Sequence, residues 1–116
     1  DMQTIIIVHA KQNSKYSLRN HIVTLLGKKV VSDEYGLTVK ESRNVNRPQG
    51  WAKIVSTSTE GHGSLNIEWD ANARMLICRI VTNGKNSPTP IIGNFINLLY
   101  KRLSSKVDSI NINTVS

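Results

Sequence analysis

The chain has 116 residues, of which 39% are hydrophobic, a balance that is typical of one globular domain and excludes a disordered chain. No apolar stretch approaches the roughly 18 residues of a membrane-spanning helix, so we expect no membrane partner. Fifteen lysine and arginine residues stand against eight aspartate and glutamate residues, giving a formal net charge of +7. Such an excess favours DNA or RNA as a partner, although charge also serves simply to keep a small domain in solution. We expect a single domain over residues 1–116, whether alone or cut from a longer protein.

One cysteine, Cys78, excludes a disulfide within the chain, which fits a reducing compartment, so we expect a cytoplasmic protein. Cys78 lies in an apolar run and is expected to be a small, buried hydrophobic side chain.

The histidines His9, His21 and His62 fall in an expected strand, helix and turn, which forms no metal-binding pattern. His62 beside Glu60 is a candidate acid–base pair, but no third group accompanies it. The sequence gives no positive evidence of catalysis, and we expect no metal and no cofactor.

The first third of the chain predicts a strand, a helix and a second, short strand. Residues 4–10 are apolar and rich in β-branched side chains, as in a buried strand. A helix follows, with Asn13 or Ser14 as its cap. Its core stripe consists of four residues at helical spacing: Leu18, Ile22, Leu25 and Leu26. A short strand over 29–32 and a turn over 33–36 complete this part of the chain.

The middle of the chain predicts an antiparallel meander. Alternating apolar and polar residues mark four strands, which cover residues 37–42, 51–58, 64–70 and 74–82. Glycine, proline and asparagine residues separate these strands, in a loop over 43–50 and in turns over 59–63 and 71–73.

The end of the chain predicts a helix and a final strand. Thr89 and Pro90 suit the N-cap and the first position of a helix, and a short strand is expected over 107–112. The buried stripe of this helix consists of Ile92, Phe95, Ile96, Leu99 and Leu103. The expected fold is therefore α+β, in the order β-α-β-β-β-β-α. It has a curved antiparallel sheet of about five to seven strands, with two helices packed on one face and the other face open.

Alternation along the strands predicts which side chains the open face presents. The inward set consists of Ala52, Ile54, Leu65, Ile67, Trp69, Leu76, Cys78 and Ile80. The outward set consists of Lys40, Trp51, Lys53, Val55, Asn66, Ile77, Arg79 and Val81. Such a mixture of basic, aromatic and small apolar side chains can contact phosphates and bases together. Glu68 and Asp70 lie on the same face and oppose that use. In the preceding strand, Glu41 is expected to share the inward side with Leu37 and Val39.

The loop over 43–51 is the densest basic and aromatic cluster in the chain. It contains Arg43, Arg47 and Trp51 and is flanked by Lys40 and Lys53. Loops of this kind often carry function, although a solvated hairpin connection would have the same composition. The candidate nucleic-acid-binding residues come from the loop and the open face together: Lys40, Arg43, Arg47, Trp51, Lys53, Asn66 and Arg79.

The order of elements resembles one half of the saddle-shaped TATA-binding-protein (TBP) fold. The resemblance rests on 46–51, which leads into the meander, and on 76–84, which leads to the closing helix. With 41–44 and 51–58, these segments are also similar to the TBP-like repeated domains of RNase LS-type toxins of antiphage toxin–antitoxin systems. The resemblance implies a saddle-shaped sheet that binds nucleic acid or another protein. It implies no active site, because the nuclease of those toxins is a different domain. DNA bending by inserted phenylalanines does not carry over, since the one phenylalanine, Phe95, lies on a buried stripe.

Besides a small enzyme that would use His62 or His9, two alternative functions follow from these expectations. The first is a nucleic-acid-binding domain, non-catalytic by itself, that acts on DNA or RNA through the basic open face and the 43–51 loop. The second is a protein-interaction or oligomerisation module of a larger nuclease, toxin or defence protein. The apolar residues Val55, Ile77 and Val81 favour the second function, because another protein or a second copy would cover them on the open face.

Overall fold

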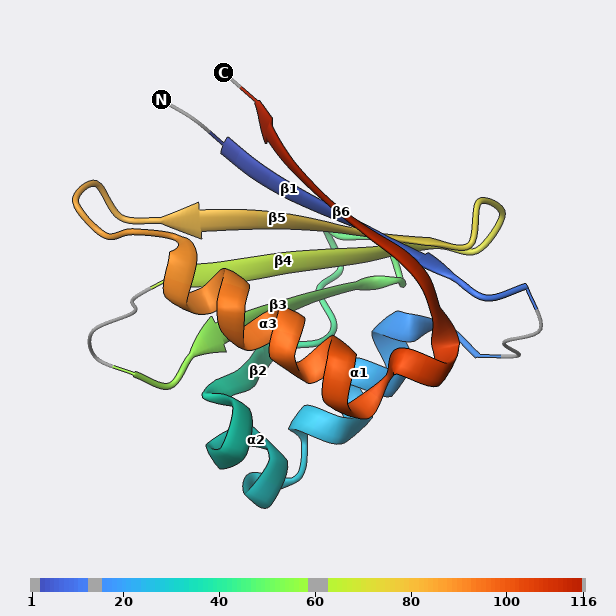
Figure 1. The fold of residues 1–116 in the computed structure, drawn as a ribbon, viewed down its shortest axis with the longest axis horizontal. Helices are drawn as coiled ribbons and strands as arrows, with labels where there is room; N and C mark the ends of the chain where they lie inside the picture. Colours follow the sequence, from blue (N-terminus) through green and yellow to red (C-terminus); the bar gives the residue numbers. More distant parts are fainter. Residues whose placement is uncertain (1–2, 13–15, 59–62, 116) are drawn as a thin grey trace.

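The computed structural model describes residues 3–12, 16–58 and 63–115 (Figure 1). Within them, six strands and three α-helices follow one another, with one 3-10 turn: β1 (Gln3–Ala10), α1 (Leu18–Leu26), α2 (Lys29–Tyr35), β2 (Leu37–Glu41), β3 (Trp51–Ser56), β4 (Gly63–Asp70), β5 (Met75–Thr82), α3 (Thr89–Arg102), η1 (Ser104–Lys106) and β6 (Val107–Val115). The predicted cap residues Asn13 and Ser14, the pair Glu60 and His62, and most of the predicted turn over 59–63 lie outside the described residues.

The six strands form one antiparallel sheet in the order β2-β3-β4-β5-β1-β6. Strands β2 to β5 are neighbours in sequence order, which confirms the predicted meander. Strand β1 pairs with β5 on one side and with β6 on the other. Figure 1 shows the three helices on one side of this sheet, so the α+β class and the open face are confirmed. None of the helices in the described parts of the chain is long and apolar enough to span a membrane.

The core lies between the sheet and the helices. Every second residue of the central strands points into it, and Ala52, Ile67 and Cys78 form one buried row across three strands. The helices contribute Leu18, Ile22, Leu26, Val31, Tyr35, Ile91, Phe95, Leu98 and Leu99. The predicted inward set is confirmed except that Trp69 is half-buried. Burial raises the pKa of the Cys78 thiol because the thiolate would lose its water, so Cys78 is a neutral core side chain, as predicted.

The segment 29–36 forms a helix and its cap, and the predicted strand and turn are wrong. Its valines favour a strand locally, but Val31 and Tyr35 both face the core, and their spacing of four fits one side of a helix. Val30 points away, with 79% of its surface exposed. Gly36 ends α2 in the left-handed conformation at φ 67°, which glycine adopts without a Cβ clash. The chain therefore has three helices in its described parts, not the predicted two.

A bulge in β2 changes the face on which Glu41 lies. The pairing of β2 with β3 is regular as far as Val39, opposite Ile54, and shifts before Glu41, which lies opposite Lys53. One extra residue in a strand moves the following side chain to the other face. Glu41 is therefore on the open face, and its predicted place beside Val39 on the inward side is wrong. Lys40, the extra residue, is exposed at the edge of the sheet.

Some element ends differ from the predicted ones by a few residues. The cap of α1 is Ser17, whose hydroxyl accepts a hydrogen bond from the backbone N–H of Asn20 at 2.9 Å. Helix α3 begins at Thr89, after Pro88 at the cap position, so Thr89 is the first helical residue and not the predicted N-cap, and Pro90 is the second. The final strand is confirmed, but β6 continues to Val115 and forms one edge of the sheet.

Candidate nucleic-acid interface

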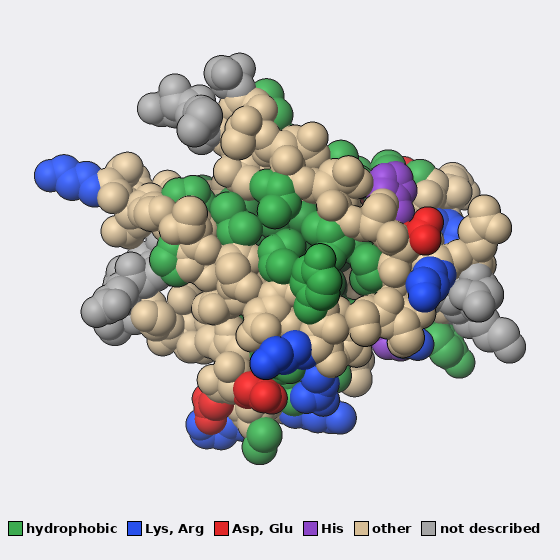
Figure 2. Space-filling model, in the orientation of Figure 1, with side chains coloured by type: hydrophobic (Ala, Val, Ile, Leu, Met, Phe, Trp, Pro, Cys, Tyr) green, Lys and Arg blue, Asp and Glu red, His purple; other side chains and the backbone are tan. Residues whose placement is uncertain are grey.

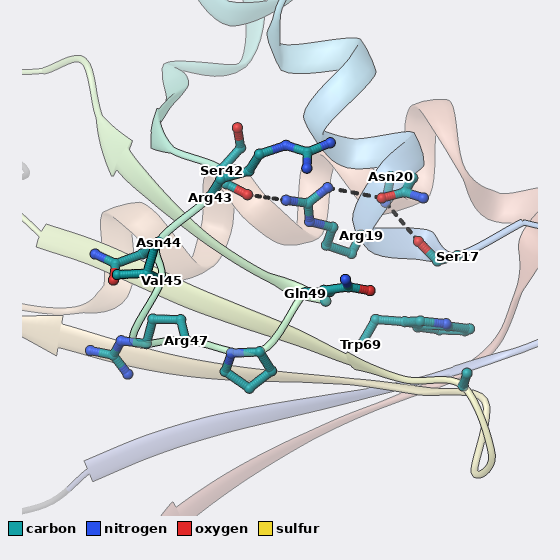
Figure 3. Close-up of a pocket in the computed structure, with 13 residues that line it drawn as sticks. Ser17, Arg19, Asn20, Ser42, Arg43, Asn44, Val45, Arg47, Gln49 and Trp69 are labelled. Carbon is teal, nitrogen blue, oxygen red and sulfur yellow. Dashed lines mark hydrogen bonds between the residues drawn. The ribbon is translucent and has the colours of Figure 1, made fainter.

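A groove with a volume of about 820 Å³ opens where the N-terminal end of α1, the loop between β2 and β3 and the end of β4 meet (Figure 3). We call it the arginine groove, because Arg19, Arg43 and Arg47 line it and no acidic residue is among its described lining residues. The lining also includes hydroxyl and amide side chains and one aromatic ring: Ser17, Asn20, Ser42, Asn44, Gln49 and Trp69. The groove is thus positively charged and rich in hydrogen-bonding groups.

Arg19, in the first turn of α1, holds the 42–50 loop in place. Its Nε and Nη2 donate to the backbone carbonyl of Trp51 at 3.2 and 3.0 Å. Nη2 also donates to the backbone carbonyl of Ser42, and Nη1 donates to Oδ1 of Asn20 at 2.9 Å. One guanidinium therefore ties both ends of the loop to α1. Because most of its N–H groups are used in this way, Arg19 would contribute mainly its charge to a ligand.

Gly50 fixes the end of the same loop against β4. The backbone N–H of Trp69 donates to the carbonyl of Gly50 at 3.0 Å. A Cβ atom at position 50 would lie 2.8 Å from the carbonyl oxygen of Trp69, too close for any side chain. Glycine is therefore required for this close approach of two backbones, and the loop is anchored to β4 as well as to α1.

Arg43 and Arg47 are the exposed cations of the groove. In the described parts of the chain, no ion pair joins either of them to an acidic side chain. Burial, and then the nearby charge of Arg43, lowers the pKa of Arg19, although a guanidinium stays protonated at neutral pH. Like charges held close together repel each other, and a bound anion would offset that repulsion.

Trp51, which the sequence places exposed on the open face, is covered by its own loop. It pairs across the strands with Glu68, so its side chain does lie on the open-face side of β3. The guanidinium of Arg47 lies over the ring at 5.2 Å from the centroid, and only 4% of the residue's surface is exposed. Its Nε1 donates to Oδ1 of Asn66 at 3.3 Å. The ring therefore positions Arg47 by a cation–π contact and is not itself accessible.

The other predicted site residues lie on or beside the open face. Lys53, Asn66 and Arg79 are direct neighbours in one cross-strand row, and Glu41 continues this row opposite Lys53. Among the described strand residues, three basic and three acidic side chains share this face and its edge: Lys40, Lys53, Arg79, Glu41, Glu68 and Asp70. Their charges cancel, so the positive charge near the loop is concentrated in the groove. Of the predicted set, only Arg43 and Arg47 line the groove, and Arg47 also contacts Trp51. Lys40, Lys53, Asn66 and Arg79 are not among its lining residues.

Most groove residues are absent from the sequence-based set, among them Arg19, Asn20, Gln49 and Trp69. Arg19 and Asn20 follow the core residue Leu18 in a helix that is distant from the loop along the chain, so only the tertiary fold brings them together. Trp69 lies on the inward side of the sheet, as alternation predicts. It is near the end of β4, however, where the core no longer covers it fully. Gln49 lies in the predicted loop, but a polar side chain is common in loops and does not by itself indicate a binding residue.

A second surface feature lies at the opposite edge of the sheet. A hollow of about 210 Å³ between the end of α3 and β6 is lined in part by Leu99, Tyr100, Val107 and Ile110. Tyr100 and Ile112 are exposed, and Figure 2 shows apolar side chains gathered in the region that lies between α3 and β6 in Figure 1. No described strand pairs with the outer side of β6.

Comparisons with protein-family models, with curated proteins and with solved structures found no match. The fold and the site therefore define a class by geometry: an α+β domain with an open six-stranded antiparallel sheet and an arginine-lined groove at the end of three strands. Among the described residues, no group of three or more His, Cys, Asp or Glu side chains is placed to hold a metal ion. The TBP-like resemblance stays a prediction.

Proposed function

We propose that this domain binds nucleic acid through the arginine groove and is non-catalytic by itself. The observation that carries the proposal is the gathering of Arg19, Arg43 and Arg47 without an acidic side chain among the groove's described lining residues. Guanidinium groups match the geometry of phosphate oxygens, and phosphate contacts supply much of the affinity for nucleic acid. The net charge of +7 adds a longer-range attraction for a polyanion.

The anchored loop supports this proposal because it reduces the entropic cost of binding. Arg19 and Gly50 already fix the 42–50 loop to α1 and β4, so a ligand would have to order mainly the side chains of Arg43 and Arg47. Ordering fewer groups leaves more of the contact energy as affinity. The groove offers positive charge and hydrogen-bond donors, which are the means of binding phosphates and base edges.

Fluorescence anisotropy with labelled oligonucleotides at increasing salt tests the proposal. We expect affinity to fall steeply as salt rises, because bound phosphates release counterions. Arg43→Gln and Arg47→Gln should each weaken binding severalfold and lower the salt slope by about one. Lys85→Gln is the matched control, because it removes the same charge from an exposed turn after β5 and should have little effect.

Arg79→Gln separates the groove from the open face, since Arg79 is exposed on β5. If this variant weakens binding as much as Arg43→Gln, the interface is the open face. If the unaltered domain shows no salt-dependent binding to single-stranded DNA, duplex DNA or RNA, the proposal is wrong.

A second candidate function, self-association, is favoured by the edge strand β6 rather than by the open face. Exposed sheet edges are usually protected by short length, bulges or charged side chains. The edge strand β2 has five residues and a bulge at Lys40, whereas β6 has nine residues and no charge from Ser109 to Val115. We infer that a second copy of the chain pairs with β6 in antiparallel orientation. Light scattering tests this: the mass of two chains supports it, and the mass of one chain at every concentration rejects it.

A further inference from the structure

The arginine groove contains an aromatic ring that none of the phosphate contacts above explains. Trp69 lines the groove and is half-buried, packed partly against the core. The guanidinium of Arg74 lies over its ring at 6.0 Å from the centroid. Figure 3 shows Trp69 and Arg43 on different sides of the same space. An aromatic ring within a positively charged groove is the combination on which proteins stack unpaired bases.

The cations and the ring differ in how a ligand can reach them. Arg43 and Arg47 are exposed, so the backbone of a single strand or of a duplex can contact them. Trp69 is recessed within the groove, and a paired base, stacked inside a duplex, cannot turn toward it. An unpaired base is free to turn out of the strand and reach the ring of Trp69. The groove volume of about 820 Å³ lies in the range that holds small ligands of nucleotide size.

We propose that the arginine groove holds an unpaired nucleotide of single-stranded DNA or RNA, with the base against Trp69 and neighbouring phosphates at Arg43 and Arg47. This inference rests on the proposed nucleic-acid binding and adds the strandedness of the ligand to it. The amide side chains of Asn20 and Gln49 also line the groove, and amides can donate to and accept from the exposed edge of a base. Stacking of a base on the ring does not depend on the sugar, so single-stranded DNA and single-stranded RNA are both tested as ligands.

The first experiment compares labelled oligothymidylate and oligouridylate of about twelve nucleotides with a duplex of the same length. We expect at least one of the single strands to bind about tenfold or more tightly than the duplex. Trp69→Leu should weaken single-strand binding by about tenfold and change duplex binding by less than about twofold. Trp69→Phe should keep most of the single-strand affinity, because it keeps an aromatic face. Equal losses on single strand and duplex in Trp69→Leu would overturn the proposal.

A second measurement leaves Trp69 in place, because this side chain also packs against the core. The chain has two tryptophans, so in the Trp51→Phe variant the emission comes from Trp69 alone. Stacking of a base should quench that emission in a saturable manner when oligothymidylate or oligouridylate is added, whereas the duplex should not. Single-strand binding without quenching would overturn the proposal.

The outcomes distinguish this inference from the proposed function. A duplex that binds as tightly as both single strands, and more weakly in Arg43→Gln, refutes the single-strand site and leaves nucleic-acid binding intact. No salt-dependent binding to any of the three oligonucleotides refutes both. Preference for thymidylate over uridylate, or the reverse, supports the site and identifies which of the two single strands it takes.

Discussion

Arg19 donates hydrogen bonds to the backbone carbonyls of Ser42, the first residue of the 42–50 loop, and of Trp51, the residue that follows the loop. The same guanidinium contributes charge to the arginine groove, so it has both a structural and an electrostatic role. Arg43 has only the second role, since it is exposed and makes no ion pair with a described acidic residue. The two arginines therefore differ in what their removal does to folding.

Arg19→Ala should lower the free energy of unfolding by about 1–3 kcal/mol, because backbone carbonyls that are partly buried lose their donor. Alanine is itself a good helix former, so the helix propensity of α1 should not suffer. Arg43→Ala is the matched control and should change stability by less than about 0.5 kcal/mol. Urea unfolding followed by tryptophan emission gives both values. Equal effects of the two substitutions would show that Arg19 does not anchor the loop.

The two tryptophans exchange the roles that the sequence predicts for them. Alternation correctly gives the face of each ring: Trp51 is on the open-face side of β3 and Trp69 on the helix side of β4. Alternation does not show what covers a ring. The loop that leads into β3 folds back so that Arg47 covers Trp51, whereas the core ends before it fully covers Trp69. The accessible aromatic residue could therefore not be predicted from the strand pattern.

Among the elements, the meander could be predicted because each of its strands has its own alternating pattern and turn residues. Helix α2 could not, because its seven residues are too few to show a helical period and its valines favour a strand. Its formation depends on tertiary packing of Val31 and Tyr35 against the core, which a local pattern does not contain. The bulge at Lys40 escapes prediction for a similar reason, since it is defined by pairing with β3.

Substitutions of two glycines, Gly36 at the end of α2 and Gly93 within α3, test the assigned conformations of these helices. Gly36→Ala should destabilise the domain by about 1–2 kcal/mol, because position 36 has φ 67° and a Cβ there would meet the amide nitrogen of Asn94 at 3.0 Å. Gly93→Ala should stabilise it by up to about 1 kcal/mol, because Gly93 lies within α3 and a Cβ there meets nothing within 4 Å. Thermal or urea unfolding of both variants measures the two effects. Changes of the same sign would contradict the assigned ends of α2 or α3.

At the scale of the whole molecule, the net charge of +7 shows that a basic surface is expected but not where it lies. The sequence indicates a basic loop, because Arg43 and Arg47 are close together along the chain, and both residues line the arginine groove. It overestimates the open face, because the bulge brings Glu41 opposite Lys53 and the charges of that face cancel. The contribution of α1 to the groove depends on the packing of distant segments, which no local pattern reveals.

The groove and the unprotected strand β6 lie toward opposite edges of the sheet, since β2 and β6 are its outermost strands. An antiparallel pairing of β6 with a second copy would therefore extend the sheet and leave both grooves uncovered. With strands about 4.8 Å apart, the two grooves would be separated by a distance on the order of 40–50 Å. Two such sites on one nucleic-acid chain would bind more tightly than one, through effective concentration alone.

Ile112→Lys tests whether β6 forms that interface. Ile112 is 53% exposed, so the variant should fold, but in a symmetric dimer it would place two like charges beside the same two-fold axis. We expect light scattering to show a dimer of the unaltered chain and a monomer of the variant. Val30→Lys is the control, because Val30 is an even more exposed valine on α2, and it should leave the dimer intact. If both variants give the same mass as the unaltered chain, β6 is not the contact. If the monomeric variant binds oligonucleotides with lower affinity and a smaller salt slope, the paired grooves act together on one strand, because fewer phosphates are then neutralised.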